Sequence, residues 1–308
     1  MVVIRTGITA MDLIGTVIPC HNRRDVTLMC LERLYHIERS GFDHRIYVVD
    51  DGSTDGTGEA IRQRFGDSVR IIDGSGDLFW TAAINKGIES AISEGCEYVH
   101  LMNDDVSFLD DFLARLYRTA KENGGLSVVG SVTCDIEDRN KVLRAGVRWD
   151  PGKVNPWMVV RDCSLGELVE KGVDRVDTLS GRSVLLPERL IRELGYFDAR
   201  RFPHSFADLD YFFRARDRGY SILADPKSLI YTRVENKLAE RLLTRGTLAG
   251  ISDLWLNVHY FGMRTVWYMS RYTRKRLRYL LADILRKCKW TLLRACLDDR
   301  KFRSRMGR

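Results

Sequence analysis

The stretch VVDDGSTDG, residues 48–56, passes directly from β-branched side chains to acids, hydroxyls and glycines. A β-branched run followed by Asp, Ser and Gly predicts a strand that ends in a turn. The residues after it, 56–65, follow a helical pattern. The stretch is therefore expected to form a strand–turn–helix unit.

Units of the same kind continue on both sides. Strands are predicted at 15–19, 45–50, 69–73, 98–102 and 127–132, and helices at 26–38, 56–65, 80–93 and 109–123. This alternation predicts an α/β fold with a mostly parallel sheet covered on both faces. From about residue 135 to 235 the runs become shorter, with helices near 187–194 and after Phe206. This part predicts an antiparallel extension that forms a second wall of a cleft.

Composition narrows the class of protein. The chain has 308 residues, of which 44% are hydrophobic and 30% charged, a balance that excludes a disordered chain. The seven cysteines include no C-x-x-C pair, which argues against a zinc ribbon or a disulfide framework. Neither an apolar run long enough to cross a bilayer nor a signal peptide is evident. We expect a cytoplasmic protein.

Positive charge is concentrated at the C-terminal end. Residues 264–308 hold 15 Lys and Arg against 3 Asp and Glu, a net of +12, which leaves 34 basic and 39 acidic residues before them. In this region five apolar residues recur at the spacing of a helix: Leu277, Leu281, Ile284, Cys288 and Leu292. Six basic residues fill the remaining positions: Lys275, Arg276, Arg278, Arg286, Lys287 and Lys289. The pattern predicts a helix on an anionic membrane surface. The alternatives are a helix packed on its own domain and, less favoured, a nucleic-acid site.

Polar loops follow each of the first four predicted strands, at 19–23 (PCHNR), 50–56 (DDGSTDG), 73–77 (DGSGD) and 103–105 (NDD). Any one loop is also ordinary turn chemistry, but the carboxyl ends of parallel strands are where α/β sheets bind ligands. The adjacent carboxylates of Asp104 and Asp105 favour Mg²⁺ or Mn²⁺, which would also bind a diphosphate. The G-x-G-x-x-G and P-loop patterns are absent.

Several of these blocks resemble one family. Residues 17–23 (VIPCHNR), 48–57 (VVDDGSTDGT) and 103–105 (NDD) resemble the nucleotide half of glycosyltransferase family 2, which has the GT-A fold. Residues 76–88 (GDLFWTAAINKGI) are similar to the branch with bacterial rhamnosyltransferases and related cell-surface polysaccharide enzymes. Residues 194–198 (LGYFD) and 206–215 (FADLDYFFRA) resemble its acceptor half, so that the resemblance covers about residues 13–235.

The resemblance implies a nucleotide-sugar-binding half at 1–135, an acceptor-binding and catalytic half at 136–240, and a basic helical region at 241–308. The implied enzyme is an inverting, metal-dependent glycosyltransferase. It would move a sugar from dTDP-rhamnose or a UDP-hexose to a hydroxyl of a glycan or lipid-linked glycan, in cell-surface polysaccharide synthesis. With its basic helices on anionic lipid, it would lie on the inner face of the cell membrane.

Site residues carry over by position. Asp208 would be the catalytic base and Asp105 the metal ligand for Mn²⁺ or Mg²⁺. The nucleotide-sugar would be bound by Pro19, His21, Asn22, Asp51, Gly76, Trp80, Lys86 and Asp104.

Two departures from the family pattern stand out. Ala207 replaces the Glu that usually precedes the base, and residues 230–236 hold no counterpart of a further metal-binding His. Asp208 could instead be a helix N-cap or an ion-pair partner of Arg214 or Arg216. The other functions considered are a nucleotidyltransferase, for which residues 19–23 lack a Gly-rich phosphate loop, and a degenerate GT-A protein that only binds a membrane or nucleic acid.

Overall fold

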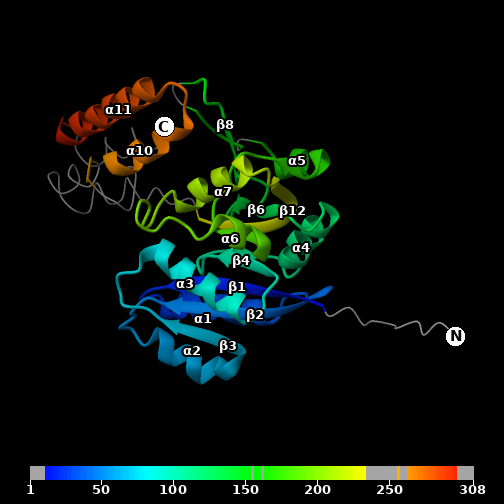
Figure 1. Cartoon of the computed structure of the whole chain (residues 1–308). Helices are drawn as coiled ribbons and strands as arrows, with labels where there is room; N and C mark the ends of the chain where they lie inside the picture. The colour runs from blue at the N-terminus through cyan, green and yellow to red at the C-terminus, as the bar shows by residue number, and fades with distance from the viewer. Residues whose placement is uncertain (1–10, 154–155, 161–162, 234–254, 257–261, 297–308) are drawn as a thin grey trace.

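Four parallel strands form one half of the central sheet (Figure 1). They are β1 (Asp12–Cys20), β2 (Phe42–Asp50), β3 (Val69–Asp73) and β4 (Tyr98–Met102), in the order β3-β2-β1-β4. The computed structural model describes residues 11–153, 156–160, 163–233, 255–256 and 262–296. Register pairs Cys20 with Asp50 and Asp50 with Asp73, so three of the polar loops leave the sheet at one edge. The four predicted strands are confirmed.

The sheet continues into the acceptor half. The strands there are β6 (Val128–Asp135), β10 (Asp174–Arg175), β11 (Ser183–Pro187) and β12 (Ile222–Thr232), and the full order is β10-β12-β6-β11-β4-β1-β2-β3. Strand β11 is antiparallel to both neighbours, while β12 is parallel to β6. Two short strands, β5 (Ser107–Phe108) and β7 (Val142–Arg144), pair with β12 and β6. The expected antiparallel part thus extends the same sheet, and within the described residues only the hairpin β8 (Val147–Trp149) and β9 (Trp157–Val159) stands apart.

Helices cover both faces of the sheet, as the sequence predicted. The helices α1 (Arg24–Tyr35), α2 (Thr57–Phe65) and α4 (Phe112–Glu122) share one core with the sheet, and α3 (Phe79–Ser93), α6 (Glu188–Leu194) and α7 (Ala207–Asp217) share the other. Strand β1 shows why: Ile14 and Ile18 enter the first core and Val17 the second. A parallel strand buried on both faces reads as a continuous apolar run. A one-turn 3₁₀ helix, η1 (Gly66–Ser68), follows α2, and α5 (Leu165–Lys171) begins with a Ser164–Glu167 capping box.

The C-terminal helices lie at the end of the molecule opposite β3 (Figure 1). They are α10 (Met263–Met269), the 3₁₀ helix η2 (Ser270–Tyr272) and α11 (Arg276–Cys296). The Trp149 indole Nε1 donates to the Tyr272 carbonyl oxygen at 2.7 Å, which attaches this segment to the acceptor half. In the part of the chain that the structure describes, no helix is both long enough and apolar enough to span a membrane.

The predicted tail helix is present, but one of its predicted outer cations lies on the inner face. Lys287, expected among the exposed cations, is 1% exposed and donates to Asp283, which is also buried. This pair faces inward with Tyr279 and Leu280. Four leucines are exposed on the helix: Leu277, Leu281, Leu285 and Leu292.

A glycine sets the distance between α3 and the sheet. A Cβ on Gly87 would lie 2.2 Å from Val17 Cγ1, so Gly87→Ala should force α3 away from β1. We expect a loss of about 1–3 kcal/mol in the free energy of unfolding, because overpacking outweighs the better helix propensity of alanine. Urea unfolding measures the loss.

The matched control is Gly166→Ala in α5, where the nearest atom to the new Cβ is 4.0 Å away. Here we expect a gain of up to about 1 kcal/mol from helix propensity alone. Equal stabilities of the two variants would show that α3 does not pack this closely.

Candidate functional site

The loops that follow β2 and β3 are joined through Asp51. Its Oδ1 accepts from the Gly76 amide at 2.8 Å and its Oδ2 from the Phe79 amide at 3.1 Å. A Cβ on Gly52 would lie 2.8 Å from Gly76 Cα, and both glycines have positive φ (66° and 94°). Only glycine fits this backbone contact. The carboxylate predicted to bind the base or ribose therefore also shapes the loop that contains Gly76.

The loop after β1 is bound to the same edge. His21 Nδ1 donates to the Asp51 carbonyl oxygen at 2.6 Å, so its Nε2 is the acceptor, and the Asn22 amide donates to it at 3.1 Å. Asn22 Oδ1 accepts from the Thr54 amide at 2.7 Å. The structure thus brings together His21, Asn22, Asp51 and Gly76, with Pro19 paired in register with Val49 beside them. Lys86 is exposed on α3, two turns into the helix.

A single arginine bridges the two adjacent carboxylates at the end of β4. Arg23 Nη1 donates to Asp104 Oδ1 at 2.8 Å, and Arg23 Nη2 donates to Asp105 Oδ2 at 3.1 Å. Asp104 is turned into the protein, with its side chain 1% exposed and Oδ2 accepting from Thr27 Oγ1 at 2.8 Å. Burial raises the pKa of Asp104, while the Arg23 charge and the Thr27 hydrogen bond act against that rise.

These residues fit a divalent cation that a substrate helps to hold. The Asp105 side chain is 23% exposed, more than that of Asp104, and is the one available to solvent. No three His, Cys, Asp or Glu side chains gather into a metal site in the described part of the chain. Mg²⁺ typically binds one or two carboxylates together with substrate phosphates and water. Asp105 fits such a site, which the protein alone would leave incomplete.

Asp208 lies in the first turn of α7, partly exposed. Its Oδ2 accepts from the Gly181 amide at 2.8 Å and its Oδ1 from the Leu209 amide at 2.9 Å. Burial nevertheless raises the pKa of its carboxyl group.

Both alternative interpretations of Asp208 are wrong. The N-cap residue of α7 is Phe206. Arg214 pairs with Asp210 at 3.1 Å and Arg216 with Asp177 at 2.8 Å. Ala207, where the family pattern has an acid, is fully buried in the core.

Trp80 connects Asp208 to the acidic pair. Its indole Nε1 donates to Asn103 Oδ1 at 3.1 Å, directly before Asp104 in sequence. A Cβ on Gly181 would lie 2.8 Å from the Trp80 ring and 3.3 Å from Asp208 Cβ. The indole therefore lies between the end of β4 and the loop that holds Asp208. Trp80 was predicted to bind the nucleotide-sugar, which stays a prediction, whereas its bridging contacts were not predicted and Asn103, Gly181 and Arg23 were given no role.

Residues 16–158 match the family model described as Glycosyl transferase family 2. No curated protein matches the chain. The branch with rhamnosyltransferases, to which residues 76–88 were compared, receives no support from these matches.

Three solved structures share the fold at low sequence identity. One is GalNAc-T7 with UDP, GalNAc and Mn²⁺ (TM-score 0.60, 12% identity, covering 98% of this chain and 57% of that one). Another is the mannosyltransferase PcManGT from Pyrobaculum calidifontis with GDP-Man and Mn²⁺ (TM-score 0.52, 15% identity, 93% and 74%). The third is TarS of S. aureus (TM-score 0.52, 14% identity, 84% and 42%).

The chain thus spans 57% of the length of GalNAc-T7 and 42% of that of TarS. Its fold is the mixed, largely parallel and curled sheet flanked by helices that GT-A glycosyltransferases have. Residues 16–158 thus match a glycosyltransferase family model, and the three neighbours share the fold.

The Arg23 bridge gives a prediction about stability. In Arg23→Gln the buried Asp104 carboxylate loses its cation, so its pKa in the folded state should rise further above the unfolded value. A raised carboxyl pKa means that stability is lost as pH rises through that pKa. We expect the variant to be about 1–3 kcal/mol less stable than wild type at pH 8 and closer to it at pH 5, by urea unfolding.

Arg62→Gln is the control, since Arg62 pairs with Asp73 at 2.6 Å where both side chains are more than half exposed. Its effect should stay below about 1 kcal/mol at both pH values. If Arg23→Gln lost the same stability at both pH values, Arg23 would not be compensating the charge of Asp104.

Proposed function

We propose that the chain is an inverting, metal-dependent glycosyltransferase that moves a sugar from a nucleoside-diphosphate donor to a hydroxyl of a glycan or lipid-linked glycan. The observation that carries the proposal is the contact of Trp80 with both Asn103 and Gly181. Through it, a carboxylate pair suited to a metal-bound diphosphate and a carboxylate suited to a general base share one site. The donor half would be residues 1–135 and the acceptor half 136–240.

Asp208 would act as the general base. It would accept the proton of the acceptor hydroxyl while that oxygen attacks the anomeric carbon and the bond from this carbon to the diphosphate breaks. A base works best when its pKa lies near the working pH, and burial moves the pKa of Asp208 in that direction. The Gly181 amide, bonded to Oδ2, would hold the carboxylate in place.

The diphosphate would lie against Asp105. A divalent cation held there would neutralise the charge that develops on the leaving group. Two of the structural neighbours contain Mn²⁺ with a nucleotide or nucleotide-sugar, which supports this proposal. Around it, His21, Asn22, Asp51 and Gly76 form the edge to which the nucleoside would bind, with dTDP-rhamnose or a UDP-hexose as the proposed donor. Lys86 is the exposed cation on α3 proposed to face the donor.

Substitutions in the site separate donor binding from catalysis. The Tm is measured with Mn²⁺ and a panel of dTDP- and UDP-sugars. We expect the correct donor to raise the Tm of wild type and of Asp208→Asn. In Asp105→Ala, the part of this rise in Tm that depends on Mn²⁺ should be lost. Release of nucleoside diphosphate should fall about 10²–10⁴-fold in Asp208→Asn, since general-base help is lost.

Asp217→Asn is the control, an exposed acid at the other end of α7 that pairs with Arg216. It should leave both measurements unchanged. If the donor raises Tm but wild type and Asp208→Asn release diphosphate equally, the protein is a donor-binding module and not this enzyme. A nucleotidyltransferase would instead release pyrophosphate from a nucleoside triphosphate.

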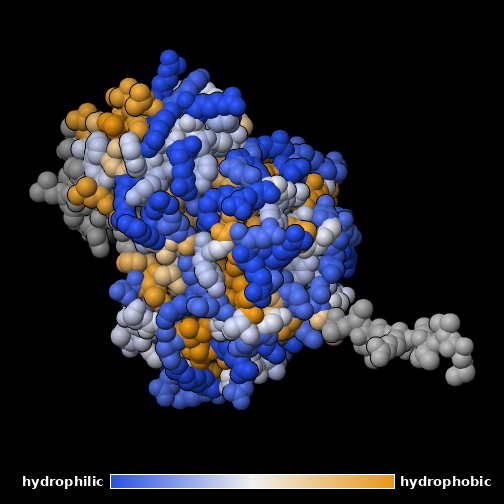
Figure 2. Space-filling model, viewed as in Figure 1, coloured by the Kyte–Doolittle hydropathy of each residue, from blue (hydrophilic) through white to orange (hydrophobic). Residues whose placement is uncertain are grey.

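We further propose that α11 lies on an anionic membrane surface, on the inner face of the cell membrane. Leu277, Leu281, Leu285 and Leu292 are all more than half exposed and follow one another at helical spacing. Arg274, Lys275, Arg276, Arg278 and Lys289 are exposed around them. Figure 2 shows hydrophobic side chains at the surface over α11 beside hydrophilic ones. Leucines flanked by cations complement the acyl boundary and the headgroups of anionic lipid.

Flotation with phosphatidylglycerol vesicles tests this surface. Changing Leu277, Leu281 and Leu285 together to Gln should reduce the bound fraction at least about tenfold, because apolar burial drives interfacial binding. The control is Leu126→Gln, an exposed leucine between α4 and β6, with no effect expected. Equal binding of both variants to these vesicles would exclude α11 as the contact.

A further inference from the structure

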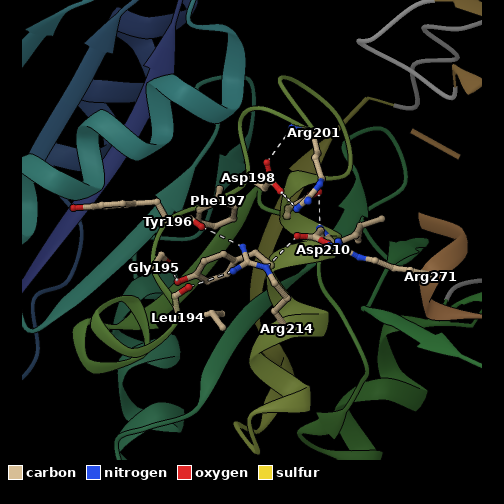
Figure 3. Close-up of polar contacts among 12 residues, drawn as sticks. Leu194, Gly195, Tyr196, Phe197, Asp198, Arg201, Asp210, Arg214 and Arg271 are labelled. Atoms are coloured by element: carbon tan, nitrogen blue, oxygen red, sulfur yellow. Dashed lines mark hydrogen bonds and ion pairs between the residues drawn. The ribbon is translucent and has the colours of Figure 1, made fainter. Parts of the chain in front are cut away.

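A cavity of about 550 Å³ lies beside α7 and away from the residues assigned to the donor. It is lined by Tyr196, Asp198, Arg201, Arg214, Arg271 and Tyr272. These come from the loop after α6, from α7 and from η2 (Figure 3). Three arginines around one opening indicate a site for an anion.

A buried carboxylate holds two of the arginines. The Asp210 side chain is 1% exposed, and Arg214 and Arg271 approach it from two sides (Figure 3). Arg214 Nε donates to Asp210 Oδ2 at 3.1 Å, Arg271 Nη2 donates to Oδ1, and the Tyr272 hydroxyl also donates to Oδ1 at 2.5 Å. Two cations share one negative charge, so one positive charge is in excess and both guanidinium groups are fixed in position.

Arg201 is the third cation. Its Nη1 donates to Asp198 Oδ2 at 2.8 Å, and its side chain is 48% exposed. The lining therefore holds three guanidinium groups against two carboxylates, counting Asp210 at its base. A guanidinium has five N–H donors. The described contacts of Arg201 with carboxylates use Nη1 and those of Arg271 use Nη2, which leaves Nε and the other Nη of each for a bound ligand.

The chemistry of the lining favours phosphate over carboxylate. Arg214 already donates from all three of its nitrogens, to Asp210 and to the carbonyl oxygens of Leu194 and Tyr196, so Arg201 and Arg271 are the arginines left to donate to a ligand. One arginine fork satisfies both oxygens of a carboxylate, whereas two arginines from separate segments suit the several oxygens of a phosphate or diphosphate. The Tyr272 hydroxyl already donates its hydrogen to Asp210. The donors left for a ligand are therefore the charged guanidinium groups.

The cavity is separated from the Asp208 site by one aromatic layer. Tyr196 and Asp198 line the cavity, while Phe197 between them packs against Trp80 with ring centroids 6.0 Å apart. Phe197 also stacks on Tyr211 at 4.0 Å. On a helix, Asp208 and Asp210 point to different sides, so the base and the arginine cavity lie on either side of the first turn of α7. The cavity and the Asp208 site thus lie on either side of Phe197 and of the first turn of α7.

We propose that this cavity binds a phosphate or diphosphate group carried by the acceptor. The acceptor role rests on the proposed function, while the phosphate site itself does not. The arginines would hold the acceptor from a point remote from the hydroxyl that reacts, and so select phosphorylated acceptors.

Calorimetry with inorganic pyrophosphate, phosphate and acetate, in EDTA so that no divalent cation contributes, tests the site. Wild type should bind pyrophosphate, and Arg201→Gln should weaken that binding about tenfold or more, the effect of one charge-assisted hydrogen bond. Arg201 is chosen because its loss leaves the buried Asp210 with its three partners, Arg214, Arg271 and Tyr272. Arg189→Gln is the matched control, an exposed arginine of α6 paired with Glu193 at 2.7 Å. Neither this control nor Asp105→Ala should change pyrophosphate binding.

Each other outcome overturns the proposal. Absence of pyrophosphate binding by wild type, equal binding by Arg201→Gln, or loss in Asp105→Ala would show that the cavity is not the phosphate site. Acetate binding as tight as phosphate would assign a carboxylate. If Arg201→Gln binds phosphatidylglycerol vesicles more weakly than wild type, by about the same factor as it binds pyrophosphate, the ligand of the cavity would be a lipid headgroup and not the acceptor. Donor-dependent stabilisation of the same samples reports separately on the proposed transferase.

Discussion

A buried carboxylate next to a second one is costly to ionise, because it loses water and is repelled by its neighbour, and a cation close by lowers that cost. At the end of β4, Arg23 supplies that cation from the neighbouring β1–α1 loop. The site depends on this compensation. It allows Asp104 to stay inside, bonded to Thr27, while Asp105 faces solvent. A divalent ion arriving with a diphosphate would meet one accessible carboxylate whose neighbour is already compensated.

The loops that follow β1, β2 and β3 are held together by hydrogen bonds for a related reason. Polar groups at the ends of buried strands need partners, and here each loop provides them for the next. The Asp51 carboxylate takes the amides of the β3–α3 loop, and its carbonyl oxygen takes His21. A nucleoside would therefore bind to an edge that is already ordered. Pre-ordered groups lose little conformational freedom on binding, which favours affinity.

Local patterns in the sequence were sufficient to predict the first half of the fold. The runs at 69–73 and 98–102 coincide with β3 and β4. Strand β4 is buried on both faces, which makes its sequence continuously apolar, whereas the edge strand β3 is only partly buried, and both strands are followed by turn residues. The position of β11 between β4 and β6 was not predictable in this way, since sheet order depends on long-range pairing.

The candidate site was predictable to a similar extent. Acids after strands pointed to Asp51, Asp104 and Asp105, and the structure places them at the sheet edge. Arg23 was in the quoted motif at 19–23. It is the only Lys or Arg in the four strand-end loops, and this was the signal in the sequence that could have identified it. The contact of Gly181 with Trp80 joins residues about a hundred positions apart, and no local pattern carries that information.

Helix α11 was expected to turn its apolar residues to anionic lipid, and the predicted Leu277, Leu281 and Leu292 are exposed. Lys287, expected among the outer cations, instead pairs with Asp283 on the inner face. A buried ion pair gives less stability than apolar packing would, because both charges lose water. A helix that served only to cover the body would be expected to turn its leucines inward. That α11 instead keeps Leu277 82% exposed and buries charge favours an external apolar environment as the reason for this arrangement.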